Sequence, residues 1–317
     1  MIPARAGLPA SREASPAGAN RPAARSSDSP SAGARAKGGD GMRRSLVSAA
    51  TRKARWLRRG LAALAVGLAL GGAARAALAP QPPASLTSYR VAIEDGFQGE
   101  HLRYRLGWLG IPAAEAEWTV SRRPGTAEPV LSAEARVRTL AAVDPLYRLR
   151  TRVQATLAAR PILPGEFLLR TEDGKYREEV VRFDHAHRTV TYAQLGGRKP
   201  HERQGPVSGQ YDPVSAAFAL RGLPLHPGDT ARIEVQTPSD LYRLEVRVVG
   251  RQRIRVPAGT FDAVELAPTI WNETRNRRPR GFESARLWVT DDARHLPLRL
   301  TSEVMIGSVY VELVSSS

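Results

Sequence analysis

Apolar and polar residues alternate along most of the chain from residue 97 onward. In the first run, Leu102, Tyr104 and Leu106 share one face of an extended segment, and Arg103 and Arg105 take the other. A period of two residues is typical of strands with one buried and one solvated face. Proline and glycine turn signals separate the runs, and the pattern predicts about twelve to fourteen strands with no strand–helix rhythm. We therefore expect an antiparallel sheet, with the polar, glycine-rich residues 196–209 forming a loop.

One segment, residues 211–221, predicts a helix instead. Asp212 suits the N-cap, Pro213 the first helical position, and Arg221 the last turn, where a cation meets the negative end of the helix dipole. Between these caps only Ser215 is polar, and a helix without a polar face must be enclosed. The predicted fold class is all-β and mostly antiparallel: a curved half-barrel or incompletely closed barrel that encloses one short helix at about 211–221.

The first 96 residues have a different composition. Residues 1–41 are mostly Ala, Gly, Pro, Ser and Arg, too poor in large apolar side chains for a core. They are expected to be disordered, or untranslated if the start codon is Met42 rather than Met1. Residues 42–76 place cations before an apolar run and a small-x-small site, which predicts a cleaved signal peptide. A linker at 77–96 and a single β domain at 97–315 follow.

This leader predicts export to the periplasm. The alternative is a membrane anchor at residues 61–78, a stretch that is short for a span. Membrane contact is expected only through this segment, and only if it stays uncleaved.

The net charge of +16 is concentrated in the leader. Residues 1–80 hold 14 Lys and Arg with three acids, and the rest of the chain holds 33 basic and 28 acidic residues. For an exported domain with nearly balanced charge we expect no nucleic-acid partner. The chain has no Cys, which excludes disulfides, thiolate metal sites and lipidation at cysteine.

Several spaced motifs support a family resemblance. They are Phe97-x-Gly-Glu100-x-Leu102-x-Tyr104, Asp212-Pro213-Val214-Ser215-Ala216, Leu220-Arg221-x-x-Pro224-Leu225-x-x-Gly228, Val256-Pro257-Ala258-Gly259-Thr260-Phe261 and Leu287-Trp288-Val289-Thr290-Asp291-Asp292-x-Arg294-x-x-Pro297. Together they resemble the DUF3108 family, exported bacterial proteins without an established function. The resemblance runs from about residue 97 to 313. It implies secretion and a mostly β fold, and it supplies no catalytic residues.

Candidate catalytic and metal-binding groups have simpler interpretations. His185 and His187 have a spacing compatible with a metal, but they fall in a predicted turn without a third ligand. Asp291 and Asp292, with Asp184 or Glu283, could form paired carboxylates for acid–base chemistry, although Asp-Asp-Ala-Arg between two strands is typical of a turn. No nucleophile elbow or phosphate loop is present. We expect no enzyme, no metal and no cofactor.

Aromatic side chains and arginines are the candidates for binding. The inward-facing aromatics could line a ligand cavity or simply fill the core: Tyr104, Trp108, Trp118 and Phe218. The basic loop at 272–280 offers four cations to an anionic partner: Arg275, Arg277, Arg278 and Arg280.

A second set of arginines is expected on the outer face of neighbouring strands: Arg103, Arg105, Arg136, Arg138, Arg148, Arg150 and Arg152. These could touch anionic lipid headgroups, lipopolysaccharide or acidic glycans. We interpret them as a solvated face balanced by Glu115, Glu117 and Glu134.

The sequence therefore predicts an exported cell-envelope protein that binds or shields an apolar or amphiphilic molecule, such as a lipid, in the concavity of the sheet. The alternative is a scaffold or accessory protein for envelope assembly, with a protein partner and no small ligand. A hydrolase of envelope polymers is the third reading.

Overall fold

The computed structural model describes residues 84–85, 91–92, 97–125, 129–195, 200–279, 284–304 and 307–317. The predicted leader and signal peptide, residues 1–76, lie outside these ranges. The described residues form β1 (Ala84–Ser85), β2 (His101–Trp108), β3 (Ile111–Arg122), β4 (Val130–Thr139), β5 (Arg150–Ala159), β6 (Ile162–Glu172), β7 (Tyr176–Asp184), β8 (Thr189–Gln194), β9 (His201–Pro206), α2 (Pro213–Arg221), β10 (Thr230–Gln236), β11 (Leu241–Val256), β12 (Gly259–Asn272), β13 (Arg286–Thr290), β14 (Pro297–Glu303) and β15 (Ser308–Ser316).

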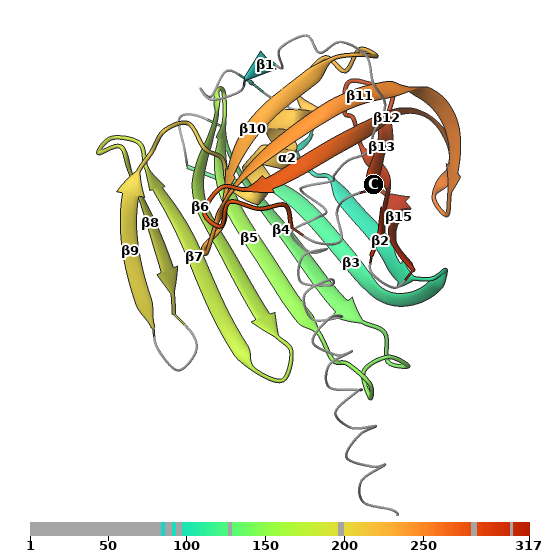
Figure 1. Ribbon diagram of the computed structural model, residues 1–317, viewed down its shortest axis with the longest axis horizontal. Helices are drawn as coiled ribbons and strands as arrows, with labels where there is room; N and C mark the ends of the chain where they lie inside the picture. Colours follow the sequence, from blue (N-terminus) through green and yellow to red (C-terminus); the bar gives the residue numbers. More distant parts are fainter. Residues whose placement is uncertain are drawn as a thin grey trace, which may run out of the picture. The chain divides into compact units, whose positions relative to one another are not determined.

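All fifteen of these strands join one sheet, in the order β1-β10-β11-β12-β13-β14-β15-β2-β3-β4-β5-β6-β7-β8-β9. Every neighbouring pair is antiparallel except β1 with β10. The sheet bends so that β10–β12 cross above β3–β7 (Figure 1). β1 and β9 are the two edges and do not pair with each other, so the sheet stays open. The predicted fold class is confirmed.

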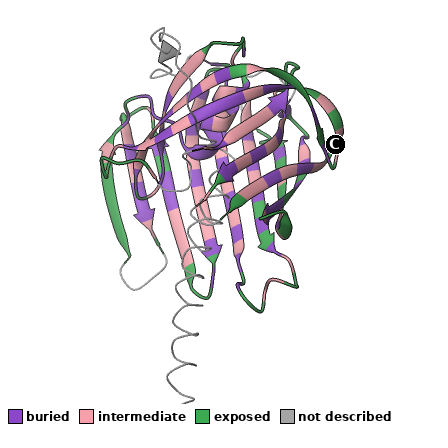
Figure 2. Ribbon diagram, turned by 45° about the vertical axis from the view of Figure 1, so that its right-hand side comes forward, coloured by how far each residue is buried: buried purple, intermediate pink, exposed green. Residues whose placement is uncertain are grey.

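Helix α2 lies inside the bend and packs against β5, β6 and β10. Seven of its nine residues are buried, and the remaining two, Ala217 and Leu220, are half-buried. Figure 2 shows the helix and the strand segments around it as the most continuously buried part of the domain. The expected enclosure of this helix by β-sheet is confirmed, and it follows from the lack of a polar face.

The buried apolar residues form two main clusters. The larger surrounds α2 and contains Phe218, Phe167 and Tyr211, all essentially without exposed surface. The second lies where β2 and β3 meet β12–β15 and contains Leu106, Leu298 and Leu313. The alternating positions of β2 and β5 that face these clusters are buried, which fixes the register of the sheet.

Two sequence expectations need correction. Residues 201–206, within the predicted loop at 196–209, form β9. Five of the six side chains of β9 are exposed, so this edge strand has no buried face and no apolar alternation to reveal it. The predicted linker at 77–96 also contributes to the domain, since β1 pairs with β10 and Val91 is buried in the larger cluster.

Candidate functional site

The predicted ligand-cavity residues do not form one cavity. Tyr104 and Trp118 line a space of about 50 Å³ beside α2. Phe218 is fully buried behind it, with ring centroids 5.9 Å from Trp118 and 5.5 Å from Phe97. Trp108 ends β2 and belongs to neither large core cluster. Small-molecule pockets usually measure roughly 300–1,000 Å³, so the space beside the helix is far below the usual size.

Arg221, expected as a helix-terminal cation, makes a buried ion pair that the sequence did not reveal. Its two Nη atoms donate to the two carboxylate oxygens of Glu100 at 2.9 and 2.6 Å, and both side chains are 7% exposed. Its guanidinium lies 4.3 Å from the ring centroid of Phe97. A forked, two-point contact with a carboxylate is the strongest geometry that arginine offers. The pair joins the end of α2 to the residue that precedes β2.

The spaced sequence motifs meet around this pair. Arg221 Nε donates to the carbonyl of Arg294 at 3.0 Å, and the Tyr104 hydroxyl donates to the carbonyl of Pro297 at 3.0 Å. Residues from the first, third and fifth motifs are therefore in contact. These motifs contribute to the domain interior around α2. Glu100 belongs to the first motif, but nothing in the amino-acid sequence indicates that it pairs with Arg221.

The other helix cap is also buried. Asp212 Oδ1 accepts the amide protons of Val214 and Ser215 at 2.8 and 3.1 Å, and its Oδ2 accepts the Ser215 hydroxyl. Complete burial raises the pKa of Asp212 to about 6, although these hydrogen bonds favour its ionised form. The carboxylate caps α2 and does not face a cavity in the described structure.

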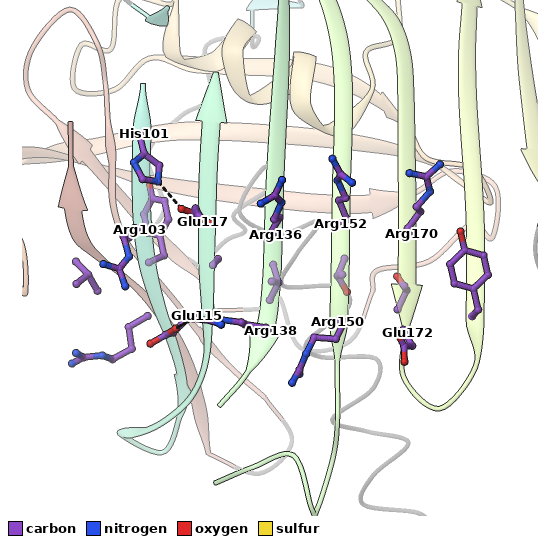
Figure 3. A pocket seen from close by; sticks show the side chains of 18 residues that line it. His101, Arg103, Glu115, Glu117, Arg136, Arg138, Arg150, Arg152, Arg170 and Glu172 are labelled. Carbon is purple, nitrogen blue, oxygen red and sulfur yellow. Dashed lines mark hydrogen bonds and ion pairs between the residues drawn. The ribbon is translucent and has the colours of Figure 1, made fainter. Parts of the chain in front are cut away.

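The larger concave site lies on the other side of the same strands. The side chains that alternate with the core-facing positions of β2–β6 surround a groove of about 780 Å³. Seven arginines and three glutamates line it, together with His101 (Figure 3). The arginines are Arg103, Arg105, Arg136, Arg138, Arg150, Arg152 and Arg170.

Strand register arranges these charges in two rows. The lower row runs across five strands as Arg105, Glu115, Arg138, Arg150 and Glu172. The upper row runs as Arg103, Glu117, Arg136, Arg152 and Arg170. In the upper row three arginines stand on consecutive strands, with no acid between them. Like charges directly opposite one another destabilise a sheet, so this row is a feature that packing alone does not favour.

Glutamates offset only part of this charge. Glu134 accepts hydrogen bonds from Arg136 and, at 2.7 Å, from Arg152. Partial burial opposes the ionisation of Glu134, but these hydrogen bonds outweigh it and lower its pKa. Glu115 accepts from Arg138 at 3.1 Å, whereas Glu117 interacts with His101.

Two further carboxylates lie against the ends of the rows. Asp144 pairs with Arg150, whose hydrogen bond lowers the pKa of the aspartate to about 2. Glu178 pairs with Arg170 at 2.8 Å. Arg103 and Arg105 are exposed and form no ion pair with any described residue. The groove therefore keeps cations that are not engaged within the domain.

Glu115, Glu117 and Glu134, which were expected to balance the charge of the outer-face arginines, therefore balance only part of it. The structure adds Arg170 to the set, because β6 places it beside Arg152. A register shift between Ala155 and Leu157 changes which residue of β6 lies opposite Arg152. The alternation of apolar and polar residues alone therefore cannot predict this neighbour. Arg148 does not line the groove and lies in the exposed connection between β4 and β5.

The basic loop is less available than expected. Arg275 Nε donates to Asp240 Oδ1 at 2.7 Å, and the Asp240 side chain is 5% exposed. Arg275 therefore fastens the loop to the turn between β10 and β11. Arg277 and Arg278 are exposed. Arg280 lies outside the described residues.

The remaining candidates occupy turns. His187 contacts Asp184 at 2.8 Å, and His185 contacts the carbonyl of Pro164 at 2.7 Å. Asp291 accepts from Arg251, and Asp292 accepts from Thr290 and from the amide of Arg294. Glu283 lies outside the described residues. Within the described ranges no group of three or more His, Cys, Asp or Glu side chains could hold a metal ion. No helix in those ranges is long and apolar enough to cross a bilayer.

Comparison with known proteins gives a family and distant structural similarity. The model of DUF3108, described as a protein of unknown function, matches residues 103–314. No curated protein sequence matches the chain.

Several solved structures are similar to this one, among them the following three. A beta-barrel-like protein of DUF1849 from Brucella abortus has a TM-score of 0.45 at 10% identity, covering 70% of this chain and 98% of its own. An exported protein with a YmcC-like fold from Bacteroides fragilis has a TM-score of 0.30 at 11% identity, covering 69% and 96%. A lipoprotein from Parabacteroides distasonis has a TM-score of 0.28 at 10% identity, covering 75% and 100%.

Proposed function

Because this chain belongs to the DUF3108 family, whose function is unknown, we propose its role from its own geometry: it is an exported, non-catalytic envelope protein that binds an anionic amphiphile. The arginine-lined groove on the outer face of β2–β6 takes the headgroup. One observation carries the proposal, namely a groove of about 780 Å³ lined by seven arginines and only three glutamates among the described residues.

The chemistry of the groove supports an anionic headgroup. Arginine presents a planar fork of donors that matches phosphate and carboxylate oxygens. The volume falls within the usual range for small-molecule sites, whereas the space of about 50 Å³ beside α2 does not. We keep the sequence-based idea of an amphiphilic ligand. We assign its binding site to the groove on the outer face of β2–β6, and not to the concavity around α2. The signal-like segment at 42–76 supports export.

The test is calorimetric titration with a soluble short-chain lipid, dihexanoyl phosphatidylglycerol, and with dihexanoyl phosphatidylcholine as its zwitterionic counterpart. We expect the anionic lipid to bind at least tenfold more tightly. Raising the salt from roughly 0.05 to 0.5 M should weaken this binding, because salt screens charges that solvent reaches.

Arg103→Gln combined with Arg105→Gln should weaken binding by at least tenfold. Neither arginine has an ion-pair partner among the described residues, so the fold loses no ion pair. Arg253→Gln is a control for loss of a cation outside the groove, since this side chain is 72% exposed on β11 and lies 4.0 Å from Asp262. Equal binding of the two lipids, or equal losses in the groove and control variants, would overturn the proposal.

A further inference from the structure

Exposed apolar side chains lie in the connections at one end of the sheet. Among the described residues six large apolar side chains are exposed, and five of them lie in or beside turns: Leu109 (52%), Ile111 (67%), Leu146 (85%), Tyr176 (55%) and Leu195 (48%). The sixth, Val249, lies in the middle of β11. Single exposed apolar residues are ordinary on protein surfaces. We call the five together the apolar rim.

The topology places the apolar rim at one end of the sheet. Strands β2–β9 are neighbours in chain order and antiparallel, so the connections β2–β3, β4–β5, β6–β7 and β8–β9 all lie at the same end. This end is the lower edge in Figure 1. The β2–β3 connection carries or adjoins two of the five residues, and each of the other three connections carries or adjoins one. The β14–β15 turn lies at the same end of the sheet, because the Leu109 amide donates to the carbonyl of Ser308 at 2.9 Å.

Leu109 occupies a backbone conformation that leucine rarely adopts. Its φ is 51°, and that of Gly110 is 79°, the signs required by a two-residue hairpin turn in which both residues have positive φ. Asn or Asp followed by Gly is the usual choice at these positions. A leucine here is strained and half-exposed, and its side chain packs over Gly307, where a Cβ would collide with Leu109 Cδ2. Outliers of this kind point to a functional demand on the side chain.

Cations lie between the apolar rim and the rest of the groove. The lower charge row of the groove begins at Arg105, four residues before Leu109, or about 14 Å along an extended strand. Arg138 and Arg150 continue that row, and the exposed Arg148 lies two residues from Leu146. Apolar side chains at an edge with arginines behind them match the layers of an anionic membrane surface, where acyl chains lie below phosphates.

We propose that the apolar rim docks this domain on the surface of an anionic phospholipid bilayer, with Leu109, Ile111 and Leu146 entering the interface and the arginine rows contacting lipid phosphates. Arginine stems can lie along apolar surface while the charged ends stay at the headgroup level. The inference rests on the proposed function only in assigning the groove to lipid headgroups. The insertion depends on Leu109, Ile111 and Leu146, which do not line the groove, whereas Tyr176 and the arginine rows are shared with it.

A local probe tests the docking. The chain has no cysteine, so Ile111→Cys provides a unique attachment site for an environment-sensitive nitrobenzoxadiazole dye, and Val249→Cys is the matched exposed control. The protein is recovered from the envelope of expressing cells and mixed with vesicles of phosphatidylglycerol and phosphatidylethanolamine, or of phosphatidylcholine alone. We expect the dye at residue 111 to shift to shorter wavelength with the anionic vesicles only, and the dye at residue 249 to stay unchanged. The probe reports on the rim even in a chain that retains residues 61–78.

A substitution that suits the turn separates docking from folding. Leu109→Asn places a residue that tolerates positive φ in the turn, so the thermal midpoint should not fall, yet vesicle affinity should drop about tenfold because the apolar side chain is lost. Binding of the soluble short-chain lipid should be unchanged. Unchanged vesicle affinity in Leu109→Asn, or equal dye shifts at residues 111 and 249, would overturn the docking proposal and leave the groove standing. Rim-dependent vesicle binding without any binding of soluble lipid would overturn the groove and leave the docking.

Discussion

Replacing Arg221 by methionine should destabilise the domain by about 3–5 kcal/mol. The change leaves the Glu100 carboxylate, 7% exposed, without its only ion-pair partner among the described residues. Removing one member of a buried pair typically costs this much, because the remaining charge stays desolvated. Methionine keeps much of the side-chain length, so the loss comes mainly from the two donors at 2.9 and 2.6 Å and the contact with the Phe97 ring.

The assay is urea unfolding followed by tryptophan fluorescence, supported by thermal melting. For a domain of about 150–250 residues, each kcal/mol shifts the melting temperature by roughly 2–4 °C, so the expected drop is about 6–20 °C. Glu100→Gln should also destabilise the domain, and the double variant Glu100→Gln/Arg221→Met should lose less than the sum of the two single losses, because its second change removes the unpaired charge.

Arg232→Met is the control. Its pair with Glu245 is as close, at 2.5 Å, but both side chains are more than one third exposed, and such pairs contribute about 0–1 kcal/mol. An Arg221→Met loss no larger than the control loss, or additive losses in the double variant, would refute the reasoning that the buried pair holds α2 in the sheet.

Three further predictions concern stability. The folded-state pKa of Asp212 is about 6 against the ordinary 3.8, so the folded protein holds a proton that the unfolded chain releases. Stability should therefore fall by about 2 kcal/mol as the pH rises from 4 to 6. Asp212→Asn keeps the capping oxygen, and urea midpoints across this range should then lose that slope. Asp240→Ala should cost about 1–3 kcal/mol in urea unfolding, because it removes the buried acceptor of Arg275, and an unchanged midpoint would contradict the anchoring of the basic loop. Arg103→Gln with Arg105→Gln should change the free energy of unfolding by less than about 1 kcal/mol, because neither side chain has an ion-pair partner among the described residues; a larger loss would show that these cations support the fold.

Alternation and capping were sufficient to predict the sheet and the helix, because both follow from local rules. Leu102, Tyr104 and Leu106 face the core as their spacing requires, and the lack of a polar face on residues 211–221 required enclosure. β9 was missed because an edge strand with exposed side chains has no pattern to read. Its hydrogen bonds with β8 stabilise it, and backbone pairing leaves no trace in composition.

The candidate site was harder to predict because it depends on register. Apart from Arg148, the outer-face arginines were predicted on the correct side of their strands, but alternation could not show that Arg136, Arg152 and Arg170 stand next to one another on consecutive strands. Nor could it show that Glu117 interacts with His101. Pairing over long sequence separations, as between Glu100 and Arg221, lies equally beyond local reasoning.

The most direct test of the binding site is a crystal structure of the protein with dihexanoyl phosphatidylglycerol. We expect the lipid phosphate within hydrogen-bond distance of guanidinium groups in the groove, among them Arg103 or Arg105, with the acyl chains directed toward the apolar rim. A phosphate bound elsewhere, or acyl chains lodged beside α2 with the groove empty, would contradict it.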